Sequence, residues 1–102
     1  RVVRVWERCN QGVAFPHAID PRIKATALIV TRWTMPIDFR TPVPSDLVFT
    51  MFGSSEEPWR HVRLLARLAR IIRAPGALGR LRNAQTDEQL RVTLLAEDES
   101  HD

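Results

Sequence analysis

Two short apolar runs followed by a long amphipathic segment constrain the fold of this chain most strongly. Residues 25–31 are rich in β-branched side chains, and residues 47–52 form a second run that stops at Gly53, so both predict buried strands. Neither run alternates between polar and apolar residues, so both faces of each strand are expected to be covered. Strands of this kind followed by helices predict an α/β fold, a layered sandwich in which helices flank a mixed β-sheet.

The segment after the second run predicts a long helix at 58–73. Residues 55–57 and Pro58 combine a polar cap, an acidic first turn and an early proline, which is a typical helix start. Apolar residues then recur at helical spacing, and arginines occupy the opposite edge. This pattern predicts an amphipathic helix that packs over a sheet.

The remaining C-terminal part predicts two more helices. The sequence Ala-Pro-Gly at 74–76 ends the long helix, and a short helix follows at 77–82. Polar residues beginning at Thr86 open a last helix that reaches about Leu95. The tail at 97–102 is polar, so we expect it to fray.

The N-terminal part gives weaker signals. Residues 2–6 favour a strand, and the apolar run at 13–15 ends at Pro16, which cannot donate a hydrogen bond to a sheet. His17 is therefore expected on a loop directly after an extended segment. Three prolines within residues 33–44 predict an irregular excursion between the two apolar runs.

Length and composition limit the classes of protein to consider. The 102 residues suit one domain, residues 1–102, with one modest core. The chain has no run of about 20 apolar residues for a membrane span and no recognisable secretion signal, and Cys9 alone cannot form an internal disulfide. These features favour the cytoplasm. The chain does not begin with Met, which suggests a fragment or a processed form.

The charge of the chain gives little support to nucleic-acid binding. The net charge is +3, and the 15 basic residues, among which Lys24 is the single lysine, are spread along the sequence. Nucleic-acid-binding domains gather such residues on one face or along one stripe. We therefore predict no nucleic-acid partner.

Two histidines are the residues best able to carry chemistry. His17 follows Pro16, and His61 lies near the start of the predicted long helix. A loop histidine is often a polar surface residue, and a helix histidine beside leucines is often part of the core, so each has a purely structural alternative. The pair could also bind a metal ion, but no third ligand stands at a recognisable spacing, and we predict no metal site.

The segment Gly12–His17 resembles a motif of the enzyme IIA domains of bacterial phosphotransferase systems. Domains of the fructose and mannitol type and their nitrogen-regulatory relatives carry Gly-x-Ala-x-Pro-His at this point. A proline-containing loop at 36–39 follows in the family's order, and His61 matches the family's second active-site histidine. The stretch at 80–90 is similar to the closing helices of the nitrogen-regulatory members, so the resemblance covers about residues 12–95.

The resemblance implies an α/β sandwich that accepts a phosphoryl group on His17 from a histidine phosphocarrier protein. It also implies that His61 donates a hydrogen bond to that group, and that no metal or organic cofactor is required. Nitrogen-regulatory members bind regulatory target proteins according to their phosphorylation state. Sugar-transport members instead pass the phosphoryl group to an enzyme IIB, and the closing segment favours the nitrogen-regulatory branch.

The N-terminal part departs from the family pattern. Relatives have a Gly-Ser-Thr-Gly type of loop preceded by an arginine, and this chain lacks that loop. An ungapped alignment places Arg1 at the arginine position, so Arg1 and Gly12 are the candidate phosphoryl-binding residues. Two alternatives stay open, namely a sugar-specific enzyme IIA and an interaction domain that is no longer phosphorylated.

The family also has helices before the histidine motif that this chain lacks. Because the apolar runs at 25–31 and 47–52 need cover on both faces, one face of the sheet is expected to be partly bare. An exposed apolar patch drives association, so we expect a homo-oligomer or a requirement for upstream sequence.

Overall fold

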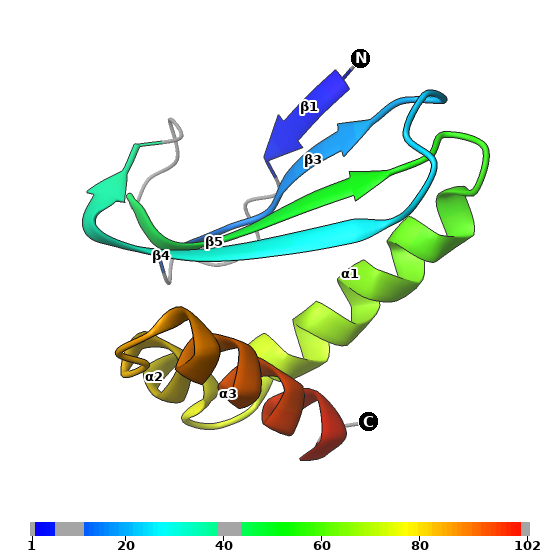
Figure 1. Ribbon diagram of the computed structural model, residues 1–102. Coiled ribbons are helices and arrows are strands. Elements are labelled where there is room, and N and C mark those ends of the chain that lie inside the picture. Colours follow the sequence, from blue (N-terminus) through cyan, green and yellow to red (C-terminus); the bar gives the residue numbers. More distant parts are fainter. Residues whose placement is uncertain (1, 6–11, 39–43, 101–102) are drawn as a thin grey trace. The chain divides into compact units, whose positions relative to one another are not determined.

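The computed structural model describes residues 2–5, 12–38 and 44–100, and in this part of the chain five strands precede three helices (Figure 1). The elements are β1 (Val2–Val5), β2 (Val13–Ala14), β3 (Pro16–Ile19), β4 (Ala27–Ile37), β5 (Ser45–Gly53), α1 (Pro58–Arg73), α2 (Ala77–Arg82) and α3 (Asp87–Ser100). The chain divides into two compact units, residues 1–61 and residues 62–102, and α1 begins in the first and continues in the second. The single domain predicted from the length stays a prediction.

Strand β5 organises the sheet of the first unit. Strands β2 and β3 pair in parallel with successive parts of β5, β4 pairs antiparallel with it, and β1 pairs antiparallel with β3. The sheet is therefore mixed, and the predicted α/β class is confirmed. The strand predicted at 2–6 is confirmed as far as Val5, while Trp6 lies outside the described residues.

The predicted burial of the second apolar run is confirmed for one face of β5. Leu47, Phe49 and Met51 are fully buried, and they share this face because side chains alternate along a strand. Phe49 stacks on Phe15, with ring centroids 5.3 Å apart. On the other face Val48 is buried and Phe52 is half-buried, so that face is covered less completely.

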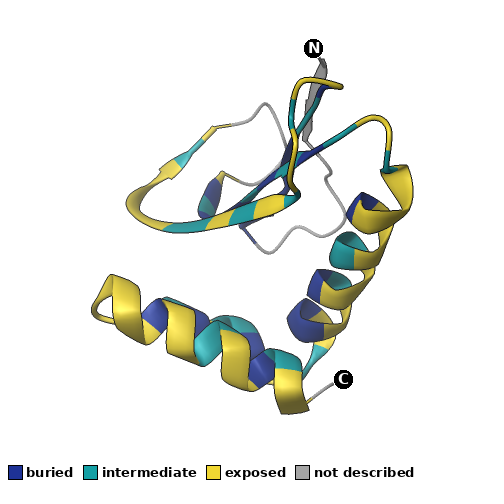
Figure 2. Ribbon diagram, turned by 45° about the vertical axis from the view of Figure 1, so that its right-hand side comes forward, coloured by how far each residue is buried: buried dark blue, intermediate teal, exposed yellow. Residues whose placement is uncertain are grey.

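Strand β4 corrects two predictions. It runs from Ala27 to Ile37, so residues 33–37 are part of a strand, although its register with β5 shifts between Arg32 and Ile37, and residues 39–43 of the predicted excursion lie outside the described part. The strand is mainly exposed and half-exposed, whereas its apolar run predicted burial (Figure 2). Among the described residues β4 pairs with β5 alone, and a strand at an edge tolerates Pro36 and leaves apolar side chains in solvent.

The helices begin where the sequence predicts. Helix α1 spans Pro58–Arg73 as expected, but the residue that caps the preceding turn is Ser54 and not Ser55, because Ser54 Oγ accepts a hydrogen bond from the Glu56 N–H at 3.1 Å. The acidic residues 56–57 precede the first turn of α1 and do not lie in it.

Helix α3 begins as predicted but ends later than predicted. At its start, Thr86 Oγ1 accepts a hydrogen bond from the Gln89 N–H at 3.1 Å, which is an N-cap contact. The helix continues to Ser100, so the tail predicted to fray from residue 97 is helical as far as it is described. The reason is a long-range pair, because buried Glu97 accepts two hydrogen bonds from Arg80 of α2, at 2.7 and 2.9 Å.

We predict that β4 drives self-association of the chain. Met35 is 81% exposed, and Ile29 and Trp33 are about half exposed, so an apolar edge strand faces solvent. The melting temperature of the native chain should rise with protein concentration, and light scattering should detect species larger than the monomer. The double variant Ile29→Lys, Met35→Lys should remove both effects.

The matched control is Val62→Lys, which replaces an exposed apolar residue of α1 and should leave association unchanged. A native chain that stays monomeric, with a melting temperature independent of concentration, would show that β4 is not an association surface.

Candidate functional site

The two histidines singled out in the sequence lie against each other. The ring centroids of His17 and His61 are 4.7 Å apart, and the rings meet edge to face at 89°. Both side chains are buried, with 9% of His17 and 8% of His61 exposed. His17 lies on β3 and His61 on the first part of α1, so the pair is contained in the first unit.

The position of His17 differs from the predicted loop. It is the second residue of β3 and is paired in register with Met51 of the central strand β5. Pro16 begins the strand and does not stop it, since a proline is tolerated as the first residue of a strand. His17 is therefore a buried strand residue with a fixed backbone, and a partner can reach only part of its ring.

His61 reaches His17 because the connection between β5 and α1 is short. Strand β5 ends at Gly53 and α1 starts at Pro58, which places His61 one turn into the helix and above the end of the strand. A Cβ atom added to Gly53 would lie 3.4 Å from His61 Nδ1, so the glycine lets the ring approach the strand closely.

The protonation of His61 follows from its burial. Removal from water disfavours the charged imidazolium, so burial lowers the pKa of His61 below its ordinary value of 6.5. Its Nδ1 atom is buried and has no hydrogen-bond partner among the described residues. The ring is therefore neutral near pH 7, and Nε2 is the nitrogen left for a contact outside the core.

Of the other two candidate residues, only Gly12 is described, and it lies away from this pair. Gly12 has a positive φ of 74°, and its carbonyl oxygen accepts hydrogen bonds from the Asp46 and Leu47 N–H groups at 2.9 and 3.2 Å. The register sets Gly12 about five residues along β5 from the level of His17, which is roughly 16 Å. Arg1 lies outside the described residues.

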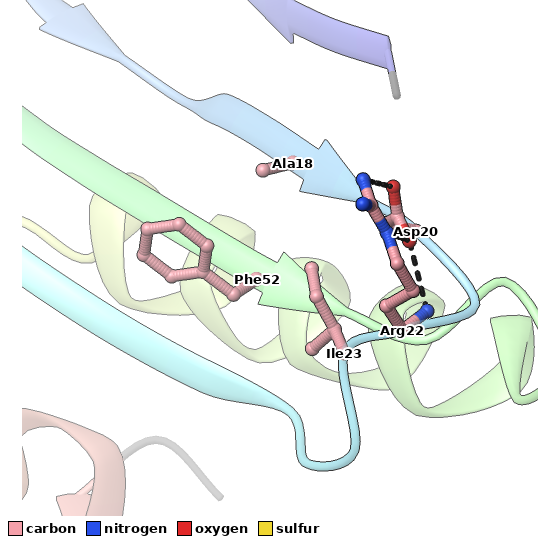
Figure 3. Close-up of a pocket in the computed structure, with 5 residues that line it drawn as sticks. All are labelled: Ala18, Asp20, Arg22, Ile23 and Phe52. Atoms are coloured by element: carbon pink, nitrogen blue, oxygen red, sulfur yellow. Dashed lines mark hydrogen bonds and ion pairs between the residues drawn. The ribbon is translucent and has the colours of Figure 1, made fainter.

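A turn directly after β3 is a feature that the sequence analysis missed. Asp20 and Arg22 form an ion pair there, and with Ala18, Ile23 and Phe52 they line a shallow pocket of about 410 Å³ (Figure 3). The sequence Asp20-Pro21-Arg22 carries a usable signal, because an aspartate before a proline favours a turn closed by the aspartate side chain.

The described residues lack two other kinds of site. Between residues 12 and 38 and between residues 44 and 100, no three His, Cys, Asp or Glu side chains gather closely enough to hold a metal ion. No helix in the described part of the chain is long and apolar enough to span a membrane.

Comparison with known proteins identifies the family. Residues 6–97 match the model of the family described as "Phosphoenolpyruvate-dependent sugar phosphotransferase system, EIIA 2". The chain is 34% identical over 87 residues to a nitrogen regulatory protein of Bradyrhizobium diazoefficiens, an alignment that covers 83% of this chain and 56% of the relative.

A solved structure agrees with this result. The nitrogen regulatory protein IIA-Ntr of Neisseria meningitidis superposes with a TM-score of 0.75 at 26% identity, covering 82% of this chain and 59% of that one. The chain thus spans less than two thirds of the length of either relative. The family match and the shared fold together establish that this chain belongs to the type 2 enzyme IIA family of phosphoenolpyruvate-dependent phosphotransferase systems, and that it is similar to the nitrogen regulatory proteins within it.

Proposed function

We propose that the chain is a phosphoryl carrier that accepts a phosphoryl group on His17 from a histidine phosphocarrier protein. The observation that carries this proposal is the edge-to-face contact of His17 with His61, at 4.7 Å between ring centroids. Burying two imidazoles side by side costs desolvation free energy, because the polar nitrogens of each ring must be removed from water. Packing alone would be served better by two apolar side chains. A reaction that uses both rings explains why they meet.

The acceptor atom follows from burial. Nδ1 of His17 is enclosed, so we assign the acceptor role to the other ring nitrogen, Nε2. A neutral imidazole nitrogen offers a lone pair, which attacks phosphorus in line with the leaving nitrogen of the donor phosphohistidine. The new N–P bond forms as the old one breaks, and the electron pair of the broken bond stays on the donor imidazole. The transfer needs no oxidant, and the charge of the phosphoryl group moves with it.

His61 would stabilise the transferred group by donating a hydrogen bond. Since its Nδ1 is buried without a partner among the described residues, the favoured tautomer carries the proton on Nε2. That N–H is held ready beside His17, so it can meet the phosphoryl oxygens without reorganisation of the site. In this proposal His17 accepts the phosphoryl group, and His61 donates a hydrogen bond to it.

The nitrogen-regulatory branch is the favoured physiological setting. Both named relatives are nitrogen regulatory proteins, which supports this branch over a sugar-specific enzyme IIA that serves an enzyme IIB. The chain would then work in the cytoplasm, where phosphorylation controls its binding to regulatory target proteins. Direct transfer to an enzyme IIB is the competing outcome, and purified enzyme IIB proteins can test it as acceptors.

We predict that His17→Ala abolishes phosphorylation. Incubation with phosphoenolpyruvate, enzyme I and a histidine phosphocarrier protein should add one acid-labile phosphoryl group to the native chain, measured by intact mass. His101→Ala is the matched control and should be labelled like the native chain, because it removes the remaining histidine outside the pair. Labelling of His17→Ala at the native rate would assign the acceptor to another residue, and an unlabelled native chain would favour a pure interaction domain.

We predict that His61→Gln slows phosphoryl transfer by roughly 10- to 1000-fold, because one hydrogen bond to a charged group is weakened or misplaced. The fold should survive, since glutamine is similar in size and retains polar atoms. The rate is measured by rapid quench with phosphorylated carrier protein, and circular dichroism checks the fold. A normal transfer rate would mean that His61 serves packing alone.

A further inference from the structure

A backbone hydrogen bond connects the turn after β3 with the end of β5, against which the His61 ring packs. The Asp20 N–H donates a hydrogen bond to the Gly53 carbonyl oxygen at 3.2 Å, and the Ile23 N–H closes the turn on the Asp20 carbonyl oxygen at 3.0 Å. The Asp20 contact continues the parallel pairing of Ile19 with Gly53 by one residue. Gly53 in turn lies directly against the ring of His61.

The ion pair of Asp20 with Arg22 closes this turn, and we call these two residues the clamp. The buried Asp20 carboxylate accepts three hydrogen bonds from Arg22, namely from the backbone N–H at 2.8 Å and from Nε and Nη2 at 2.9 Å each (Figure 3). These bonds hold the pKa of Asp20 well below its usual range. The Arg22 side chain is 82% exposed, so its charge remains solvated while it neutralises a carboxylate that is only 8% exposed.

The clamp cannot touch a phosphoryl group on His17 directly. Ala18 and Phe52, which line the pocket beside the clamp, are register partners, and so are His17 and Met51. Because neighbouring residues of a strand point to opposite faces, the pocket lies on the face opposite the histidine pair. Any effect of the clamp on the histidine pair therefore passes through the backbone, either along β3 or through the hydrogen bond of Asp20 to Gly53.

We propose that Asp20 and Arg22 are positioning residues, which hold Gly53 in place and thereby set the approach of His61 to His17. The inference rests on the proposed phosphoryl transfer for its consequence, but its geometry does not depend on that transfer. The clamp limits motion of the strand end, and a displacement of about 1 Å at a reacting site can cost on the order of 100-fold in rate. The clamp affects the transfer rate only by setting the spacing of the two rings, since neither Asp20 nor Arg22 contacts the reacting atoms.

The test uses Asp20→Ala, Asp20→Asn and Arg22→Ala in the full chain, with two measurements on each. The first is the rate of phosphoryl transfer from the phosphorylated carrier protein. The second is the pKa of His61 from the pH dependence of its ring signals in NMR, which needs no phosphorylation. Glu88→Ala is the matched control, because it removes an ion pair with Arg91 on the exposed surface of α3.

Asp20→Ala should slow transfer by roughly 10- to 100-fold and raise the pKa of His61 toward 6.5, as the ring loses its enclosure. Asp20→Asn keeps an acceptor for the Arg22 N–H. Its transfer rate and the pKa of His61 should therefore lie between those of Asp20→Ala and those of the native chain. Arg22→Ala lies at an exposed position, so it tests the clamp even if Asp20→Ala fails to fold. Glu88→Ala should change neither measurement.

A folded Arg22→Ala or Asp20→Ala chain with the native pKa of His61 would overturn the positioning role. If the native chain is not phosphorylated at all, the proposed function fails, whereas the pKa measurement still decides whether the clamp sets the environment of His61. A changed pKa with an unchanged transfer rate would also refute the proposal, because it would separate the position of His61 from transfer.

Discussion

The parallel pairing of β3 with β5 is the constraint on which the site depends. Its register sets His17 beside Met51 and Ile19 beside Gly53, so one strand presents the first histidine and the end of the other supports the second. A slip of one residue would turn His17 to the opposite face of the sheet. Packing favours this register, because it buries one face of β5 and stacks Phe15 on Phe49.

Burial of the two rings also decides their chemistry. A charged imidazolium loses more hydration free energy than a neutral ring when it leaves water, so burial favours the neutral form of His61. A neutral ring keeps the lone pair that a nucleophile needs and the N–H that a hydrogen-bond donor needs. The lowered pKa of His61 is therefore consistent with its proposed task, since burial favours the neutral ring near pH 7.

The sequence predicted best those features that depend on neighbouring residues. Pro58 and the helical periodicity located α1, and Thr86 located the start of α3, because capping and amphipathicity are local properties. The end of α3 was missed because Glu97 is held by Arg80, seventeen residues earlier in the chain. No local pattern in the tail reports a partner at that distance.

The errors at β4 and β3 have a related cause. The composition of β4 indicates a strand but not its place in the sheet, and an edge position exposes side chains such as Met35 that a central position would bury. Pro16 was interpreted as a strand terminator, although its position at the first residue makes it compatible with pairing. The contact of His17 with His61 was beyond sequence reasoning from periodicity, and the family resemblance alone suggested that the two belong to one site.

The support around each ring favours His17 over His61 as the acceptor in the proposed phosphoryl transfer. Burial does not separate them, because both are almost fully enclosed and both have a buried Nδ1. The backbone of His17, however, is paired on both sides, with Arg4 of β1 and with Met51 of β5. A covalent acceptor must hold its reacting nitrogen in line with an incoming phosphorus atom, and a strand fixed on two sides provides that rigidity. His61 instead lies one turn into a helix, beside the acceptor ring, which suits a residue that donates a hydrogen bond and forms no covalent bond.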